Sequence, residues 1–142
     1  HHVAMGAETL ALRVQRQSDN AMVMCRFLND HPRVKRVYYP GLEDHPQHHR
    51  AEKLFRAYGG LFSFELNSDL DLWDFLNRLS VIVKSSNLGD NRTLAIPVAH
   101  TIYHEMGAER RASMGIDESL IRISSGIEDS EDLVADLAAG FG

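Results

Sequence analysis

The stretch L-I-R-I-S-S-G-I-E-D, residues 120–129, joins a short apolar strand to the start of a helix and sets one arginine inside the strand. Branched apolar residues predict a strand over residues 120–123, and the acidic pair Glu128 and Asp129 is typical of a helix N-terminus. A guanidinium buried among Ile and Leu side chains costs free energy unless it has a partner. Its planar donors fit a carboxylate held by two hydrogen bonds. Arg122 is therefore either a clamp for an anionic ligand group or a strand arginine that faces solvent or pairs with a nearby acid, and these residues leave both interpretations open.

Length and composition are those of one globular domain with its own core. The 142 residues are 44% hydrophobic and 25% charged, with a formal net charge of -5, which is ordinary for such a domain. No cluster of Lys and Arg indicates a nucleic-acid surface, and no apolar run approaches the roughly 18 residues of a membrane span. No segment has the pattern of a signal peptide. The single cysteine, Cys25, cannot form an internal disulfide, so we expect a reducing, cytoplasmic location.

Apolar periodicity predicts helices that alternate with four short strands. The first helix, residues 6–30, carries an apolar stripe that includes Leu10, Val14 and Cys25. Residues 85–104 show no helical period, and loops of this length are often functional. The pattern predicts an α/β fold with helices mainly on one face of a small sheet, and it leaves the strand directions open. Strands are expected at residues 34–39, 61–66, 81–83 and 120–123, and the later helices at residues 46–58, 68–79, 105–114 and 130–141.

Capping signals and spacing also predict which side chains the helices bury. Ser68, with Asp71 three residues later, resembles a capping box, and either Asp129 or Ser130 would cap the last helix. The residues expected on the inner faces are Leu54 and Phe55 in the second helix, Leu70, Trp73, Leu76 and Leu79 in the third, and Leu133, Val134, Leu137 and Phe141 in the last.

Histidine and acidic clusters do not form a recognisable catalytic or metal-binding pattern. His45 and His48 lie close in sequence, but no Cys, Asp or Glu at ligand spacing completes a tetrahedral set. Glu105 follows both His100 and His104, whereas in a zinc-protease motif the glutamate lies between the two histidines. Glu128-Asp129 is adjacent rather than facing, so helix capping explains it better than acid–base catalysis. We therefore predict no metal site and no catalytic residue in this chain.

Six blocks in order along the chain resemble the C-terminal domain of the pyridoxal-phosphate (PLP) enzymes of cysteine and methionine metabolism, the transsulfuration family. The likeness covers nearly the whole chain, and six ordered blocks are much more specific than one short motif. It implies the C-terminal domain of a fold-type I PLP enzyme, an α+β sandwich with a four-stranded, largely antiparallel sheet. The blocks are E-T-L-A-L-R (8–13), V-Y-Y-P-G-L (37–42), H-P-Q-H (45–48), G-G-L-F-S-F-E-L (59–66), N-L-G-D (87–90), and L-I-R-I-S-S-G-I-E-D followed by D-L-V-A-D-L (132–137).

The resemblance also implies a larger N-terminal domain that this sequence does not contain. In the family that domain carries the Schiff-base lysine, the tyrosine stacked on the cofactor and the aspartate at the pyridine nitrogen. No segment around Lys35, Lys53 or Lys84 resembles the lysine segment. We therefore expect PLP to be bound mainly by the absent domain and the present chain to be inactive alone. Residues 1–5 begin with two histidines and are interpreted as a tag or linker remnant, which leaves residues 6–142 as the domain.

The resemblance assigns four residues to substrate binding. Arg122 matches the arginine that binds the substrate α-carboxylate, where paired donors would orient the amino acid. Asn87 falls where many relatives have a serine, and the Leu88 main-chain N–H would be a second donor to the carboxylate. Thr101 matches a threonine of the substrate and cofactor pocket. The chain departs from the family in three places: Ile102 replaces a common histidine, N-L-G-D replaces S-x-G-G, and I-P-V-A-H-T replaces H-P-A-x-x-T.

The expected parent activity is γ-replacement on an acylhomoserine, of the cystathionine γ-synthase or sulfhydrylase type, because N-L-G-D looks closer to the acylhomoserine sulfhydrylases. A γ- or β-lyase of cystathionine or methionine is the second choice, and a stand-alone, non-enzymatic ligand or interaction domain is the alternative of another class. The expected partners are the amino-acid substrate, the large domain and further copies of the chain, with neither nucleic acid nor membrane. The contact between copies is expected at the first helix, where Leu10 and Val14 would join Leu94 and Ile96 in an exposed apolar surface.

Overall fold

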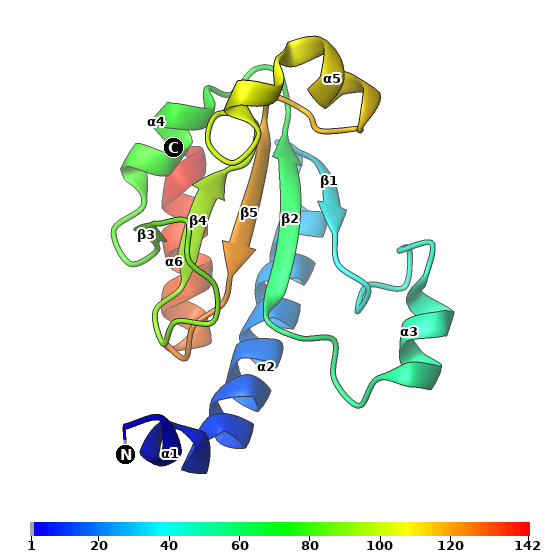
Figure 1. Ribbon diagram of the computed structural model, residues 1–142. Coiled ribbons are helices and arrows are strands. Elements are labelled where there is room, and N and C mark those ends of the chain that lie inside the picture. Colours follow the sequence, from blue (N-terminus) through cyan, green and yellow to red (C-terminus); the bar gives the residue numbers. More distant parts are fainter. Residues whose placement is uncertain (1) are drawn as a thin grey trace.

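The structure, a computed structural model, describes residues 2–142 and consists of one sheet with helices packed against it (Figure 1). The strands are β1 (Val34–Tyr38), β2 (Leu61–Leu66), β3 (Val83–Lys84), β4 (Leu94–Pro97) and β5 (Leu120–Ser124). The α-helices are α1 (His2–Glu8), α2 (Leu10–Asn29), α3 (His48–Leu54), α4 (Leu72–Arg78), α5 (Ala108–Ser113) and α6 (Ser130–Phe141), and a short 3₁₀ helix, η1, spans His104–Met106.

The sheet places β5, the strand that carries Arg122, at its centre. The strand order is β1-β2-β5-β4-β3. The pairs β1–β2, β2–β5 and β4–β5 are antiparallel, and β3–β4 is parallel. The largely antiparallel, helix-backed sandwich is therefore as predicted. The number of strands in that prediction was wrong, because the sheet has five strands rather than four.

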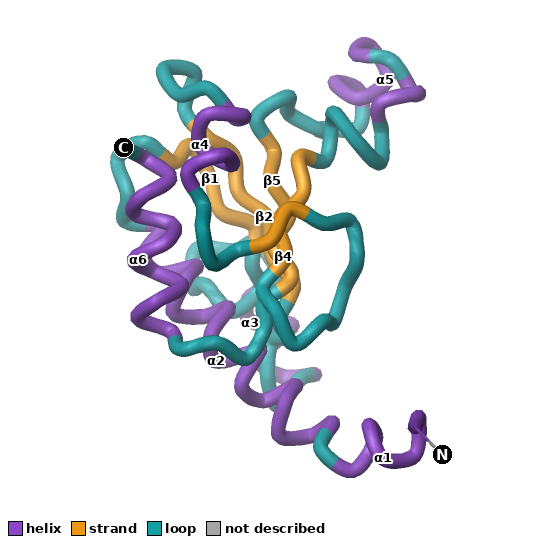
Figure 2. Tube along the Cα trace, turned by 90° about the vertical axis from the view of Figure 1, so that its left-hand side faces the viewer, coloured by secondary structure: helices purple, strands orange, loops and turns teal. Residues whose placement is uncertain are grey.

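The core lies between one face of the sheet and the helices α2 and α6, which Figure 2 shows on the same side of the strands. Alternation along a strand sends every second side chain to this layer. β2 contributes Phe62 and Phe64, and β5 contributes Ile121 and Ile123. Burial of each such side chain stabilises the fold by about 1.5–3 kcal/mol. The helices supply Ala21, Met24, Cys25, Leu28, Leu133, Leu137 and Phe141 to the same cluster.

The missed strand is β4, which the sequence shows only as a short apolar run stopped by Pro97. Four residues are too few to display a period of two, so pairing with β5 decides their conformation. Leu94 pairs with Ser124 and Ile96 pairs with Arg122. The expectation that Leu94 and Ile96 are exposed was wrong, since they are 2% and 4% accessible.

The expected strand at residues 81–83 is mostly not a strand, because a helix side chain binds its backbone. Asp136, buried in α6, accepts hydrogen bonds from the N–H and hydroxyl of Ser80 (2.7 and 2.9 Å) and from the N–H of Ile82 (2.8 Å). Burial alone would raise the pKa of this carboxyl, but the hydrogen bonds from Ile82 and Ser80 outweigh it and hold the pKa below its usual value. The strand β3 therefore begins only at Val83.

The single helix predicted over residues 6–30 is divided at Thr9, where α1 ends and α2 begins. The apolar stripe of α2 is buried only in its second half, where Ala21, Cys25 and Leu28 are inaccessible. Leu10 and Val14 are 50% and 44% exposed, because the start of α2 projects past the sheet with α1 (Figure 1). Among residues 2–142, no helix combines the length and the hydropathy needed to cross a membrane.

Three other helix predictions were wrong in their boundaries or in their buried faces. Asp71, not Ser68, caps α4, and its carboxylate accepts from the N–H groups of Trp73 and Asp74. The helix therefore starts later, which turns Leu72, Phe75 and Leu76 inward and leaves Trp73 half-exposed.

α3 is shorter than predicted and buries Ala51, while Leu54 and Phe55 are exposed. Gly107, at φ +81, divides the helix expected over residues 105–114 into η1 and α5. Asp129 caps α6 by accepting from the Glu131 N–H, as one of the two predicted caps.

Candidate functional site

The face of the sheet opposite the core carries Arg122 in its central strand. The register places Arg122 beside Ile96 of β4 on one side and Ser63 of β2 on the other, and Ser63 in turn faces Tyr38 of β1. Since Ile121 and Ile123 belong to the core, alternation turns Arg122 away from it. The arginine is therefore anchored on both sides by strands, which limits its movement more than a loop would.

The guanidinium of Arg122 is only partly used by the protein. Its Nη2 donates to the carbonyl of Ser86 at 2.9 Å. Its Nε is buried and has no hydrogen-bond partner among the described residues. A buried N–H without an acceptor costs about 1–3 kcal/mol, so the domain itself does not complete the hydrogen bonding of this guanidinium.

The Ser86 contact brings the loop of residues 85–93 beside Arg122. Asn87 and Leu88 follow Ser86 directly, and Leu88 is 57% exposed. The Asn87 N–H is 3.5 Å from the Ser85 hydroxyl, a long contact, and the Leu88 N–H has no hydrogen bond within the described residues. The next residue, Gly89, turns with φ +69 and donates its N–H to the Ser124 hydroxyl at 3.0 Å. Two of the predicted substrate-binding residues therefore lie at the tip of a loop that is tied to the same strand as Arg122.

Thr101 lies farther along the chain and faces its own segment. Its hydroxyl donates to the carbonyl of Pro97 at 2.6 Å. Thr101 and Ser86 line one cavity of about 370 Å³, together with Trp73 of α4 and Ile96 of β4. The Ser86 contact thus brings Arg122 beside the segment of Asn87 and Leu88, whereas Thr101 lines a cavity with Ser86 and is bonded to Pro97.

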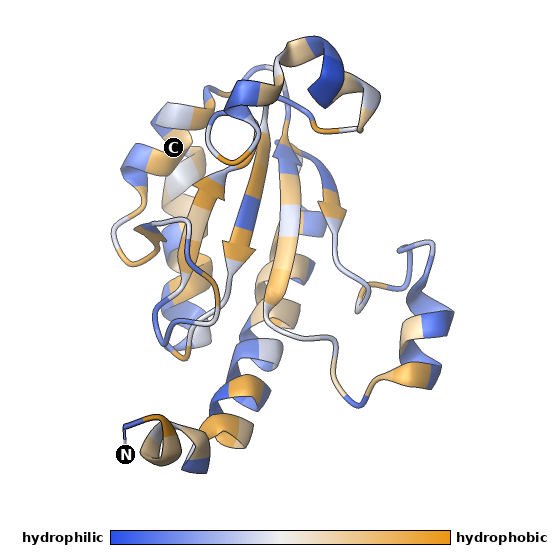
Figure 3. Cartoon of the chain, viewed as in Figure 1, coloured by the Kyte–Doolittle hydropathy of each residue, from blue (hydrophilic) through white to orange (hydrophobic). Residues whose placement is uncertain are grey.

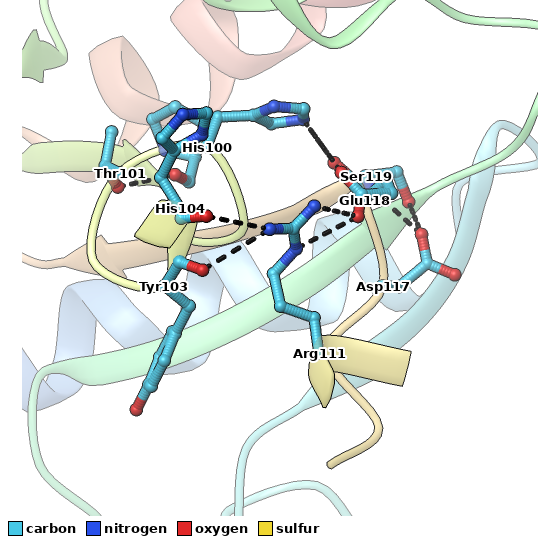
Figure 4. Close-up of polar contacts among 9 residues, drawn as sticks. His100, Thr101, Tyr103, His104, Arg111, Asp117, Glu118 and Ser119 are labelled. Carbon is cyan, nitrogen blue, oxygen red and sulfur yellow. Dashed lines mark hydrogen bonds and ion pairs between the residues drawn. The ribbon is translucent and has the colours of Figure 1, made fainter. Parts of the chain in front are cut away.

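The segment that carries Thr101 is held in place by Arg111, a residue that the sequence did not single out. Arg111 is 8% accessible, and Figure 4 shows it between two backbone carbonyls and the Glu118 side chain. It donates to the carbonyls of Tyr103 and His104 (3.4 and 3.2 Å) and twice to one oxygen of Glu118 (3.0 and 2.7 Å). The motif A-E-R-R-A-S resembles any solvated helix, so no local signal distinguishes this arginine.

Two of the three lysines, Lys35 and Lys84, are paired with other side chains and are not free to react with an aldehyde. Lys35 of β1 contacts Asp117 at 2.6 Å and Glu65 at 3.0 Å, and hydrogen bonds to these two acids raise its pKa. The ammonium of Lys84 donates to Asn77 at 2.8 Å. Among residues 2–142, no three or more His, Cys, Asp or Glu side chains are placed to hold a metal ion.

Comparisons with known proteins identify relatives over almost the whole chain. L-methionine γ-lyase of Fusobacterium nucleatum subsp. polymorphum is 38% identical over 99% of this chain and 36% of its own length. O-succinylhomoserine sulfhydrylase of Pseudomonas aeruginosa is 38% identical over 96% of this chain and 34% of its own length. The chain therefore spans about a third of the length of these relatives.

A solved structure of the same kind shares the fold. Cystathionine γ-lyase from Lactobacillus plantarum, complexed with L-serine, superposes with a TM-score of 0.92 at 36% identity, over 96% of this chain and 36% of the other. The family profile of the Cys/Met metabolism PLP-dependent enzymes matches residues 1–142. The chain belongs to the family of Cys/Met metabolism PLP-dependent enzymes.

Proposed function

We propose that residues 6–142 are the C-terminal, substrate-side domain of a longer PLP-dependent enzyme, and that Arg122 binds the α-carboxylate of its amino-acid substrate. The observation that carries this proposal is the Arg122 guanidinium, which is fixed in the central strand and keeps a buried Nε without a partner. The coverage of about a third of each relative supports a larger parent chain. The cytoplasmic location expected from Cys25 is part of the same proposal.

A carboxylate fits this site better than a neutral group does. Arg122 can give it a charged, directional donor, and such hydrogen bonds are about twice as strong as neutral ones. The free N–H of Leu88 would be a second donor from the neighbouring loop, and Asn87 would contribute its side-chain amide. Two donors from different segments hold a carboxylate in one orientation, which is what fixes the reacting carbon of an amino acid. The serine complex of the lactobacillar relative agrees with an amino-acid ligand.

The cofactor does not fit among the residues of this chain. Lys35 and Lys84 are engaged with other side chains, and Lys53 lies in α3, outside the sheet. None of the three lies in the row of Arg122 across the sheet. We therefore propose that the rest of the parent enzyme binds PLP, which when bound stabilises negative charge on the substrate carbon. The part played by the present domain is to bind and orient the substrate.

For the reaction itself we propose γ-replacement on an acylhomoserine, with γ- or β-elimination as the second candidate. N-L-G-D in the loop beside Arg122 supports the first. The sulfhydrylase and the lyase are both 38% identical, so similarity does not rank the two reactions. The full-length enzyme should be given acylhomoserine with and without sulfide. If sulfide leads to a thiol amino acid and less keto acid is formed, the result supports replacement. If keto acid and ammonia remain the products when sulfide is present, the result favours elimination.

The isolated chain should not take up PLP at one defined lysine. Added PLP is expected to give only slow, scattered reaction with surface lysines, because no lysine here has an unpaired amine in an anion-binding pocket. Borohydride reduction followed by peptide mass spectrometry measures this. One stoichiometric adduct on Lys35, Lys53 or Lys84 would contradict it, and free N-acetyl-lysine provides the reference rate. A genomic reading frame that encodes this domain without the large domain would instead support a stand-alone binding domain.

The isolated chain should form a homodimer or larger assembly through the arm made of α1 and the first turns of α2. Figure 3 shows apolar residues along this arm, which exposes Val3, Met5, Leu10, Leu12 and Val14. Contiguous apolar patches of a few hundred Å² tend to associate, and we propose that the large domain covers Leu10, Leu12 and Val14 in the parent. Light scattering should report more than 16.0 kDa, and Leu12→Glu, at a 74% exposed site, should reduce the mass. A monomer at high concentration would refute the prediction.

A further inference from the structure

The turn between β5 and α6 is bonded to the segment that enters β4. Glu128 accepts the Thr93 N–H through one carboxylate oxygen (2.5 Å) and the Thr93 hydroxyl through the other (2.8 Å). The same hydroxyl accepts from the Gly126 N–H at 2.8 Å, and the Ile127 N–H donates to the Asn91 carbonyl at 2.9 Å. Both oxygens of the Glu128 carboxylate are thus committed to a single residue of a segment distant in sequence.

The fit between these two segments is close as well as polar. A Cβ at Gly126 would lie 2.4 Å from the backbone of Arg92 and Asn91. Only glycine therefore lets these two segments of the chain approach so closely. From the other side, Asn20 of α2, 1% accessible, donates to the carbonyls of Gly126 (3.0 Å) and Glu128 (2.9 Å). The turn is therefore fixed to the core helix and can serve as a rigid base for the loop.

The segment held by Glu128 is the end of the loop of residues 85–93. Further contacts hold that loop at the Asp90 carbonyl, which accepts from Gln17 at 3.0 Å, at Gly89 through Ser124, and at the Ser86 carbonyl through Arg122. Asn87 and Leu88 lie between the last two contacts. Their distance from the Arg122 guanidinium thus depends on where the loop ends are held.

We propose that Glu128 is a positioning residue of the carboxylate site. Through Thr93 it fixes the end of the loop, so that the Leu88 N–H and the Arg122 guanidinium face one and the same anion. This inference rests on the function proposed above. The neighbouring Asp129 has a different task, since its carboxylate accepts from the Glu131 N–H at 2.9 Å and caps α6. Of the two adjacent acids, Glu128 therefore positions the loop and Asp129 caps the helix.

The test uses the full-length enzyme with Glu128→Ala and, as the matched control, Asp129→Ala. In Glu128→Ala the KM for the amino-acid substrate should rise about tenfold while kcat changes less than about threefold, because uniform binding is lost and chemistry is not. Amide hydrogen exchange across residues 86–93 should become faster. Asp129→Ala loses the α6 cap but should leave both KM and loop exchange unchanged. Gly126→Ala, which displaces the same segment sterically, should reproduce the Glu128→Ala result.

Unchanged exchange in Glu128→Ala would overturn the proposal, and so would faster exchange with an unchanged KM, since the contact would then be only structural. A rise in KM of equal size in Asp129→Ala would overturn it too, because loss of α6 would be the cause. Arg122→Lys, measured in parallel, tests the carboxylate function separately from the positioning role of Glu128. If that variant kept normal kinetics, the carboxylate function would fail, and loop exchange in Glu128→Ala would still report whether Glu128 holds the loop.

Discussion

Replacing Arg122 by lysine in the full-length enzyme should lower kcat/KM by an amount equivalent to about 2–4 kcal/mol, the range for losing a charged and partly desolvated contact. Lysine keeps the charge but presents it at a single point, without the planar pair of donors that fits a carboxylate. It would also lose the hydrogen bond that Nη2 donates to Ser86, which joins the strand to the loop. Steady-state kinetics with the amino-acid substrate measures the effect.

The stability of the same variant is the internal control. Arg122 lies on the face of the sheet away from the core, so its replacement should hardly change the midpoint of urea denaturation. A variant with near-normal kcat/KM would make Arg122 a structural strand residue. A variant that lost activity only in proportion to its folded fraction would do the same. Loss of activity in a fully folded protein is the outcome that supports the carboxylate site.

Phe64→Ala should reduce the free energy of unfolding of the chain by about 3–5 kcal/mol, the usual range for a buried phenylalanine. Phe64 of β2 is inaccessible and meets the ring of Phe75 edge-on, with the centroids 5.8 Å apart. Removing it takes away this ring contact between the sheet and α4 and leaves a cavity. Because a domain of this size is stable by only about 5–15 kcal/mol, the variant should be close to unfolding.

Phe55→Ala is the matched control for that measurement. Phe55 is 55% exposed at the end of α3, so the same chemical change should cost at most about 0.5 kcal/mol. Urea denaturation followed by circular dichroism gives both values. Equal losses in the two variants would mean that α3 is buried in solution by a partner or by the sheet.

Local sequence signals predicted those features that neighbouring residues determine. The strands that contain residues 34–38, 61–66 and 120–123 were predicted because branched and aromatic residues alternate or cluster there. Capping preference limited the start of α6 to Asp129 or Ser130, of which the structure shows Asp129, and helical spacing predicted the inner face at Leu133 and Leu137. Arg122 was distinguishable as a charge within an apolar run, and the ordered family blocks led to the PLP enzymes, which the relatives confirm.

Side-chain tasks that depend on distant partners were not predictable in this way. Glu128 and Asp129 look alike in sequence, yet Asp129 caps a helix and Glu128 holds Thr93, 35 residues away. Arg111 resembles its exposed neighbour Arg110 but is buried against Glu118. In each case the distinguishing contact comes from another segment, so no local pattern records it.

The sequence by itself thus determined the family, the helix-backed sandwich and the arginine set within an apolar strand, because periodicity, caps and short motifs act over a few neighbouring residues. Only the tertiary structure decided that the strand of Arg122 is central, that β4 is a strand, that β3 begins at Val83, and that the first turns of α2 stay exposed. Those outcomes depend on pairing with β5, on the Asp136 carboxylate, and on where the sheet ends. Contacts between distant segments outweigh weak local preferences, and their free energy appears only when the chain is folded.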